Sequence, residues 1–297
     1  MNSWKRTGVD YWRLSSELIF YYHKIEKGLS LPGEKRFFGS PAAVKVVSLI
    51  NEWKISGLSQ DDPIFLGAIE SLRKYLERFP ENTTEEQSAL FASISELTEN
   101  HLPCHELSTP YQPSTNEMEK PDIVLSALAK QRRSVRNFKD KKVDIAIVRE
   151  ALLIAQQAPS ACNRQATRVH LYEQSPLMQE LLKLQNGNRG FGHKIPLLAI
   201  ITSESSTFFD FTERNEPYLD GGLFLGFFLL GLQSLGLSSC CLNWCTTPWH
   251  DSEVRKLTKI APSEKILTFL AIGYESADSV VPRSSRRKLD SIVSTNI

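Results

Sequence analysis

The spacing of hydrophobic residues divides the chain into a mostly helical first part and a mixed second part. In residues 1–100 the apolar positions recur every three or four residues. This period predicts amphipathic helices at 11–27, at 68–79, and after a capping box formed by Thr83 and Glu86. Gly28 follows the first of them and predicts a left-handed helix end. Strand-like patterns of comparable strength do not occur in this part.

The second part alternates helical and extended periods. The predicted helices are 122–131, 144–157, 176–185, 217–235 and 251–259, and the predicted strands are 168–172, 197–202, 239–245 and 265–273. Single helices between short strands indicate an α+β or α/β sheet domain. The 217–235 helix is apolar on nearly every side, which is typical of a core helix or of a subunit interface.

A proline-rich stretch separates the two parts. Residues 101–121 carry four prolines and few aliphatic side chains. Because proline lacks a backbone donor and biases the preceding residue away from helix, an extended connector is expected here. We therefore expect a helical N-terminal extension with its connector at 1–120 and a second domain at 121–297.

Composition and charge narrow the functional classes. Hydrophobic residues make up 41% and charged residues 23%, which fits a globular protein and argues against disorder. The formal net charge of +1 gives no overall attraction to nucleic acid or to an anionic membrane. The start of the chain lacks an apolar signal core, and the longest apolar run is about half of the roughly 20 residues that a membrane span needs. With five scattered cysteines, these features predict a soluble cytoplasmic protein.

A cluster of arginines is the strongest candidate for binding chemistry. Arg132, Arg133, Ser134 and Arg136 lie where a predicted helix gives way to extended chain. Guanidinium groups are forked donors that match the oxygens of a phosphate, and the serine hydroxyl adds one more donor. A second basic run lies at 283–288. The alternative for both is a solvated basic surface.

The loop at 158–165 is a second candidate. Its sequence, APSACNRQ, places short donor and acceptor groups between a predicted helix and a predicted strand. Such groups suit a flat heterocycle with mixed hydrogen-bonding edges. An ordinary helix-to-strand loop would also use proline, serine and asparagine.

Five blocks in this order resemble the nitroreductase family of FMN-dependent oxidoreductases. They are RRSVRNF from Arg132, APSACNRQ from Ala158, the apolar helix with Asp220 that leads into LGLSSCCLNW, the FLAIGY strand, and the terminal PRSSRRKL. The resemblance covers roughly 121–297. In addition, HKIEKGLSLPGEKRFFG from His23 resembles an N-terminal extension found on a subgroup of these proteins.

The resemblance implies an α+β fold, with a central antiparallel or mixed sheet flanked by helices, and a homodimer whose two FMN sites use both subunits. It places Arg132, Arg133 and Ser134 at the phosphate and ribityl end, joined by Arg286, and Arg136 at the pyrimidine edge. The loop from the opposite subunit supplies Pro159, Ser160, Ala161, Asn163 and Gln165. The segment against the ring is Cys241, Leu242 and Asn243, with a backbone amide that faces flavin N5, and 185–194 corresponds to a covering segment.

The implied activity is electron transfer from NAD(P)H, a transient co-substrate, through FMN to an electron-poor small molecule, with ping-pong kinetics. Hydride passes at flavin N5, so no side-chain nucleophile is required. Two alternatives remain open: a flavin-binding sensor or interaction module without turnover, and a dedicated biosynthetic flavoenzyme whose substrate is selected by the extension.

Other chemistries fit the sequence less well. Cys240, Cys241, Cys245 and His250 lack the usual Cys-x2-Cys spacing, and strand alternation sends the first two to opposite faces, so no metal site is expected. The glycines at 221–226 do not form a dinucleotide-binding fingerprint. The arginine clusters are not interleaved with aromatic residues as in nucleic-acid-binding modules, so no nucleic-acid partner is expected.

Overall fold

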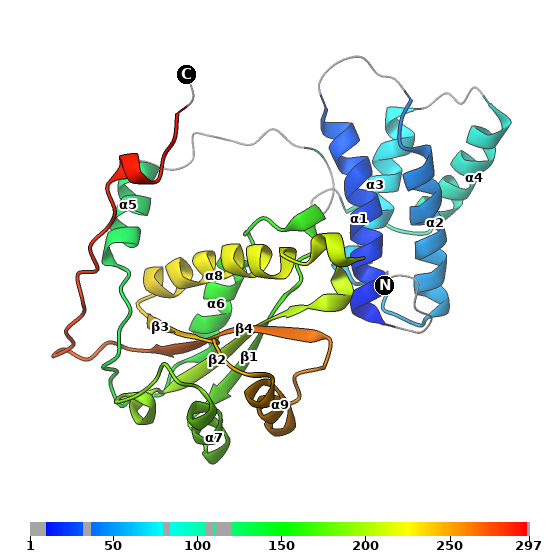
Figure 1. The fold of residues 1–297 in the computed structure, drawn as a ribbon. Helices are drawn as coiled ribbons and strands as arrows, with labels where there is room; N and C mark the ends of the chain where they lie inside the picture. The colour runs from blue at the N-terminus through cyan, green and yellow to red at the C-terminus, as the bar shows by residue number, and fades with distance from the viewer. Residues whose placement is uncertain (1–9, 32–36, 80–83, 105–109, 111–119, 296–297) are drawn as a thin grey trace.

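The fold, taken from a computed structural model, joins a helical bundle to an α+β domain (Figure 1). The structure describes residues 10–31, 37–79, 84–104, 110 and 120–295. Most of the predicted connector at 101–121 therefore lies outside the described residues. None of the described helices is long and apolar enough to cross a membrane.

The N-terminal extension is a bundle of helices α1 (Tyr11–Ser30), α2 (Ser40–Ile55), α3 (Pro63–Arg78) and α4 (Glu85–Glu99). Asp10 caps α1 by accepting from the backbone N–H of Trp12 at 3.0 Å, and Asp62 caps α3 in the same way. The apolar faces of the bundle enclose a core of its own, in which Trp53 and Tyr75 are fully buried.

Several details of the extension differ from the sequence prediction. Helix α3 begins at Pro63, five residues before the predicted start at 68. Helix α2 was not predicted, although its buried Val46, Leu49, Ile50 and Trp53 have helical spacing. Gly28 does not end α1, which continues to Ser30; a Cβ at Gly28 would lie 2.0 Å from the Phe38 ring, so this glycine is needed for packing. The observed cap of α4 is Thr84, whereas the predicted cap, Thr83, lies outside the described residues.

The second part contains a four-stranded antiparallel sheet in the order β1-β2-β4-β3. Its strands are β1 (Thr167–Glu173), β2 (Leu197–Glu204), β3 (Ser238–Asn243) and β4 (Glu264–Gly273). Side chains alternate between two cores, so that Ile200 and Phe269 face one layer while Ile201 and Leu270 face the other. All four predicted strands are therefore confirmed, with ends within two residues of the prediction.

Helices cover both faces of this sheet (Figure 1). Helices α6 (Ile145–Ala155) and α8 (Glu216–Ser234) pack on one face, and α7 (Pro176–Leu184) and α9 (Pro248–Leu257) pack on the other. Helix α5 (Pro121–Gln131) has no buried residue. After β4 the chain runs as an extended C-terminal arm, residues 274–295, whose start bonds to the segment after α5 through Ser276 N–H and the Asn137 carbonyl at 3.0 Å. The α+β prediction is confirmed.

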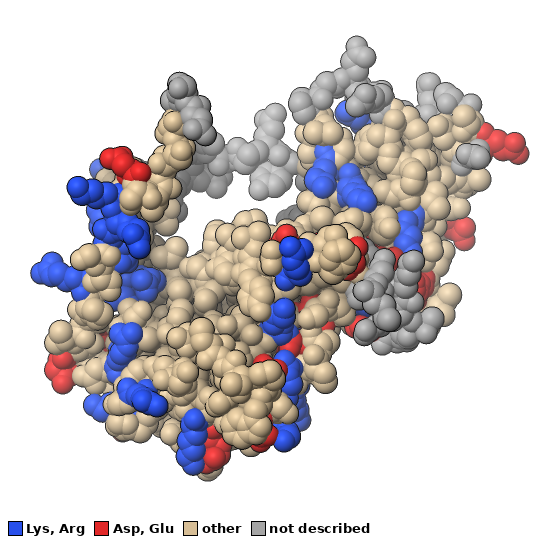
Figure 2. Space-filling view, in the orientation of Figure 1, with Lys and Arg blue, Asp and Glu red and all other residues tan. Residues whose placement is uncertain are grey.

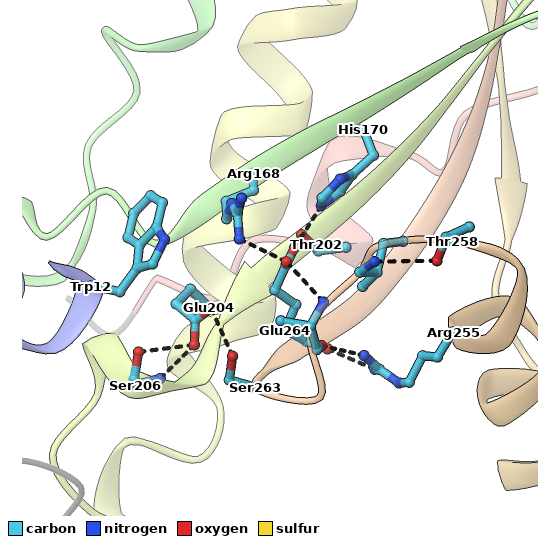
Figure 3. A network of polar contacts seen from close by, with 12 residues as sticks. Trp12, Arg168, His170, Thr202, Glu204, Ser206, Arg255, Thr258, Ser263 and Glu264 are labelled. Atoms are coloured by element: carbon cyan, nitrogen blue, oxygen red, sulfur yellow. Dashed lines mark hydrogen bonds and ion pairs between the residues drawn. The ribbon is translucent and has the colours of Figure 1, made fainter. Parts of the chain in front are cut away.

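A buried carboxylate joins three strands near the end of the sheet that faces α1 (Figure 3). Glu264 accepts hydrogen bonds from Arg168 at 2.7 Å, from His170 at 2.6 Å and from the Thr202 hydroxyl at 2.6 Å. Burial raises the pKa of Glu264, but the hydrogen bonds from His170, from Thr202 and from the Ala261 N–H outweigh that effect and lower the pKa to about 2. The carboxylate therefore stays charged and fixes the register of β1, β2 and β4.

Candidate functional site

The predicted phosphate-binding arginines lie along the β3 edge of the sheet. Helix α5 ends at Gln131, and the extended segment after it forms a parallel bridge from Ser134 to Ser239, with Val135 N–H donating to the Ser239 carbonyl at 3.1 Å. This bridge brings Arg132, Ser134 and Arg136 beside the cysteines of β3. Burial raises the pKa of the Cys240 thiol, and the positive charges of Arg136 and Arg132 oppose that rise.

These guanidinium groups lack neutralising carboxylates. Within the part of the chain that the structure describes, Arg132, Arg133 and Arg136 form no ion pair. Among the described residues, Arg133 donates to the Arg132 carbonyl at 2.9 Å, and Arg136 donates to the Ser134 carbonyl at 3.3 Å. Arg132 and Arg133 are half-buried. Uncompensated cations that are partly desolvated suit a dianionic phosphate as ligand.

The segment predicted to lie against a ring is at the end of β3. Cys241 and Asn243 point outward, whereas Leu242 is buried, as strand alternation predicts. Gln185 donates to the Asn243 carbonyl at 2.6 Å and accepts from Gly187 N–H at 2.7 Å. The 185–194 segment is thus tied to β3. No role was predicted for Gln185 itself, although its burial and its side-chain hydrogen bonds make it the anchor of this corner.

The C-terminal arm contributes further positive charge. Figure 2 shows Lys and Arg side chains gathered on the side of the molecule where α5 and this arm lie. Arg286 is exposed and donates to the Ser284 carbonyl within the arm itself. The convergence of Arg286 and Arg132 on one phosphate stays a prediction.

The loop at 158–165 lies at the opposite edge of the sheet, where it leads into β1. Three of its residues, Cys162, Asn163 and Gln165, adopt left-handed backbone angles with φ of 52°, 57° and 52°. Such angles are unfavourable for residues other than glycine by roughly 1 kcal/mol each. The loop must therefore be held by its surroundings.

Two buried charged groups hold this loop. The Asp220 carboxylate, on α8, accepts from Ala161 N–H at 3.0 and 3.1 Å. Arg164, which is 1% exposed, donates to the Ala161 carbonyl at 3.0 Å and forms a two-pronged ion pair with Glu213 at 2.6 and 2.9 Å. These roles were not predicted. For Asp220 a signal exists, because it is the single charged residue in the apolar stretch 217–235.

The burial of Asp220 has an electrostatic cost. Burial raises the pKa of this carboxyl to about 6, and the hydrogen bond from Ala161 N–H opposes the rise. A carboxyl placed this way binds a proton more readily than one in water.

The predicted site residues thus form two groups within one chain. Arg132, Arg133, Ser134, Arg136, Cys241, Leu242 and Asn243 lie along β3, whereas Pro159, Ser160, Ala161, Asn163 and Gln165 lie beside β1. With strands about 4.8 Å apart, the two edges of a four-stranded sheet are separated by roughly 14 Å. The two groups therefore do not form one compact cluster within a single chain.

Comparisons with known proteins agree with the fold. Residues 129–274 match the family model described as the nitroreductase family. No curated protein matches the chain.

Several solved structures superpose on the second part. A protein from Parabacteroides distasonis, provisionally described as an NADH dehydrogenase/NAD(P)H nitroreductase, aligns with a TM-score of 0.51 and 17% identity over 58% of this chain and 98% of its own. A nitroreductase family protein from Streptococcus pneumoniae aligns with a TM-score of 0.50 and 21% identity over 58% of this chain and 100% of its own. Residues 129–274 of the chain therefore form a domain of the nitroreductase family.

Proposed function

We propose that this protein is an FMN-dependent oxidoreductase that uses NAD(P)H and acts as a homodimer. NAD(P)H reduces the bound flavin and leaves, and an electron-poor small molecule then takes the electrons in a second half-reaction. In this proposal residues 121–297 form the FMN-binding domain, and residues 1–120 form the extension and connector.

The main support for the proposal is the arginine segment beside β3, whose positive charges have no paired carboxylate among the described residues. Arg132 and Arg133 are half-buried, and no described carboxylate pairs with either of them. Charge-assisted hydrogen bonds contribute roughly 1.5–3 kcal/mol each, so two or three of them hold a phosphate without covalent attachment. FMN carries such a phosphate and, when bound, supplies two-electron exchange between NAD(P)H and an acceptor.

The neighbouring residues suit a flavin ring as well. At the predicted pyrimidine edge, Arg136 would supply a permanent positive charge next to the negative charge of the reduced ring, which would favour acceptance of electrons. Cys240 is buried and its pKa is raised by that burial, so its thiol stays protonated and gives no competing nucleophile.

A homodimer accounts for the separation of the two groups of site residues. Leu219, Leu223 and Phe227 follow one another at four-residue steps on α8, and they are 58%, 37% and 38% exposed. Such a stripe, on a helix that is apolar on its other side too, favours burial against a second copy. The loop of one chain would then reach the arginine segment of its partner.

The absorbance spectrum of the purified protein tests the proposal directly. We expect a yellow protein, or one that turns yellow when incubated with FMN and filtered, and we expect NADH or NADPH to bleach the flavin band within seconds without oxygen. A protein that stays colourless after incubation with FMN would contradict the proposal. Tight retention of flavin with no bleaching by either nucleotide would instead support the sensor alternative.

A further inference from the structure

A cavity of about 810 Å³ lies between the N-terminal extension and the second part of the chain. Tyr11, Trp12 and Asp62 form the wall on the side of the extension. The opposite wall contains Arg149 on α6 and residues of the loop at 158–165, including Pro159, Ser160 and Gln165. The volume falls within the range of small-molecule sites.

Helix α1 is held against this second wall by two contacts between an aromatic ring and an arginine. The Trp12 ring lies 5.1 Å from the Arg168 guanidinium carbon (Figure 3), and the Phe20 ring lies 5.9 Å from that of Arg164. Both contacts join α1 to the second part of the chain, so the cavity has a wall on each side.

Charged groups in the cavity differ in whether they already have partners. Asp62 accepts from the Tyr11 hydroxyl at 3.1 Å and from Ile64 N–H at 2.8 Å, and Asp220 accepts from Ala161 N–H. Arg149 forms no ion pair or hydrogen bond with any other described residue. The donors to Asp62 and Asp220 are neutral, so these carboxylates are hydrogen-bonded but not ion-paired. Arg149 is exposed, and its N–H donors are free among the described residues; it lies on the wall opposite Tyr11 and Trp12.

We propose that this cavity binds a planar aromatic acid, whose carboxylate pairs with Arg149 and whose ring packs on Tyr11 and Trp12. We assign the bound acid as the electron acceptor because the same cavity contains the loop that is predicted to reach the flavin of the partner subunit. This assignment rests on the proposed function. The extension is then the element that selects the acceptor.

Calorimetric titration with 2-naphthoate tests the binding itself. Naphthoate has a flat ring and one carboxylate, and it carries no group that a reduced flavin would reduce under these conditions, so the measurement is independent of turnover. We expect the full-length protein to bind 2-naphthoate about tenfold more tightly than the neutral 2-naphthalenemethanol. Equal affinity for the acid and the alcohol would overturn the proposal.

Matched variants locate the site. Arg149→Gln should weaken 2-naphthoate binding about tenfold and leave binding of the alcohol unchanged. The exposed Arg214→Gln should bind the acid like the wild type. Unchanged binding in Arg149→Gln, or an equal loss in Arg214→Gln, would overturn the assignment. A protein that binds naphthoate in this way but takes up no FMN would refute the proposed function and leave the binding site intact.

Discussion

Several charged side chains in the candidate site are partly or fully removed from water without an opposite charge paired with them in the described structure. Arg132 and Arg133 are half-buried without a carboxylate in the described structure, and Asp220 is 3% exposed with one backbone N–H as donor. Each arrangement lowers stability unless a ligand or a structural role compensates for it. For the arginines we attribute that compensation to a phosphate, and for Asp220 to the strained loop that it holds.

Removal of Arg132 should weaken flavin retention. Loss of one buried phosphate contact corresponds to about 2–3 kcal/mol, so Arg132→Ala should raise the FMN dissociation constant by tens-fold or more. Quenching of FMN fluorescence on binding measures this constant. Arg287→Ala is the control, because in an extended arm only one of the adjacent Arg286 and Arg287 faces inward. An unchanged dissociation constant in Arg132→Ala would remove this residue from the site.

Asp220 should make stability fall as the pH rises. Its pKa is about 6 in the folded protein and near 3.8 in the unfolded chain, so folding takes up a proton between these values. The stabilising contribution is present below pH 4 and is lost as the pH passes 6. Relative to Asp220→Asn, the free energy of unfolding of the wild type should fall by about 2–3 kcal/mol from pH 4 to pH 7 in urea titrations. Parallel curves for the two proteins would contradict the argument.

At the scale of elements, α1 and the loop at 158–165 form one packing unit. The Phe20 ring lies over Arg164 and is 6.0 Å from the Phe209 ring. Phe209 comes just before η5 (Phe211–Glu213), and Glu213 in η5 forms the ion pair with Arg164. The loop with its left-handed residues is therefore covered by the extension. Through this contact the extension can affect the conformation of the loop, although none of the predicted flavin-site residues belongs to the extension.

Truncation of Phe20 should loosen this loop. In Phe20→Ala the backbone amides of 161–166 should exchange with deuterium several-fold faster, because the cover over Arg164 is lost. Phe37→Ala is the matched control, since Phe37 contacts Tyr75 and Phe79 within the extension. Equal exchange of the loop in Phe20→Ala and wild type would show that α1 does not support it.

Periodicity predicted the elements well and the contacts between them poorly. Helices α5 to α8 and the strands were predicted because their apolar residues repeat with clear periods and Asp144 caps α6. Helix α9 begins three residues earlier than predicted, at Pro248, where proline opens a first turn. The Arg164–Glu213 pair joins residues 49 apart in the sequence, and local patterns carry no information about such pairs.

At the scale of the whole molecule, a monomer exposes large apolar areas to water. Helix α5 exposes Ile123, Val124 and Leu125, and α8 exposes Leu219, Leu223 and Phe227. Exposed apolar patches of this kind indicate association. From composition alone, α8 was predicted to lie in a core or in a subunit interface, and the resemblance predicted a homodimer with sites shared by two chains. The strand order β1-β2-β4-β3 places the two groups of predicted site residues at opposite edges of the sheet, which is consistent with that prediction.

A charge in the α8 stripe should separate the chains. We expect Leu223→Glu to sediment as a monomer and to lose bound FMN, because a buried glutamate without a partner strongly disfavours the interface. Glu216→Gln, at the first turn of the same helix, should remain a dimer with full flavin content. A monomeric Leu223→Glu that keeps one FMN per chain would contradict the shared site.

A mixed dimer tests the central claim, that each flavin site joins the arginine segment of one chain to the loop of the other. Arg132→Ala and Asn163→Ala chains, each with its own affinity tag, are co-expressed, and the dimer that carries both tags is isolated for flavin analysis. If each site is shared, one site of the mixed dimer carries both substitutions and the other site carries neither. We therefore predict one FMN per mixed dimer. Each homodimer, in which both sites carry a substitution, should lose its FMN. If the mixed dimer is as depleted as the two homodimers, each site lies within a single chain and the account is wrong.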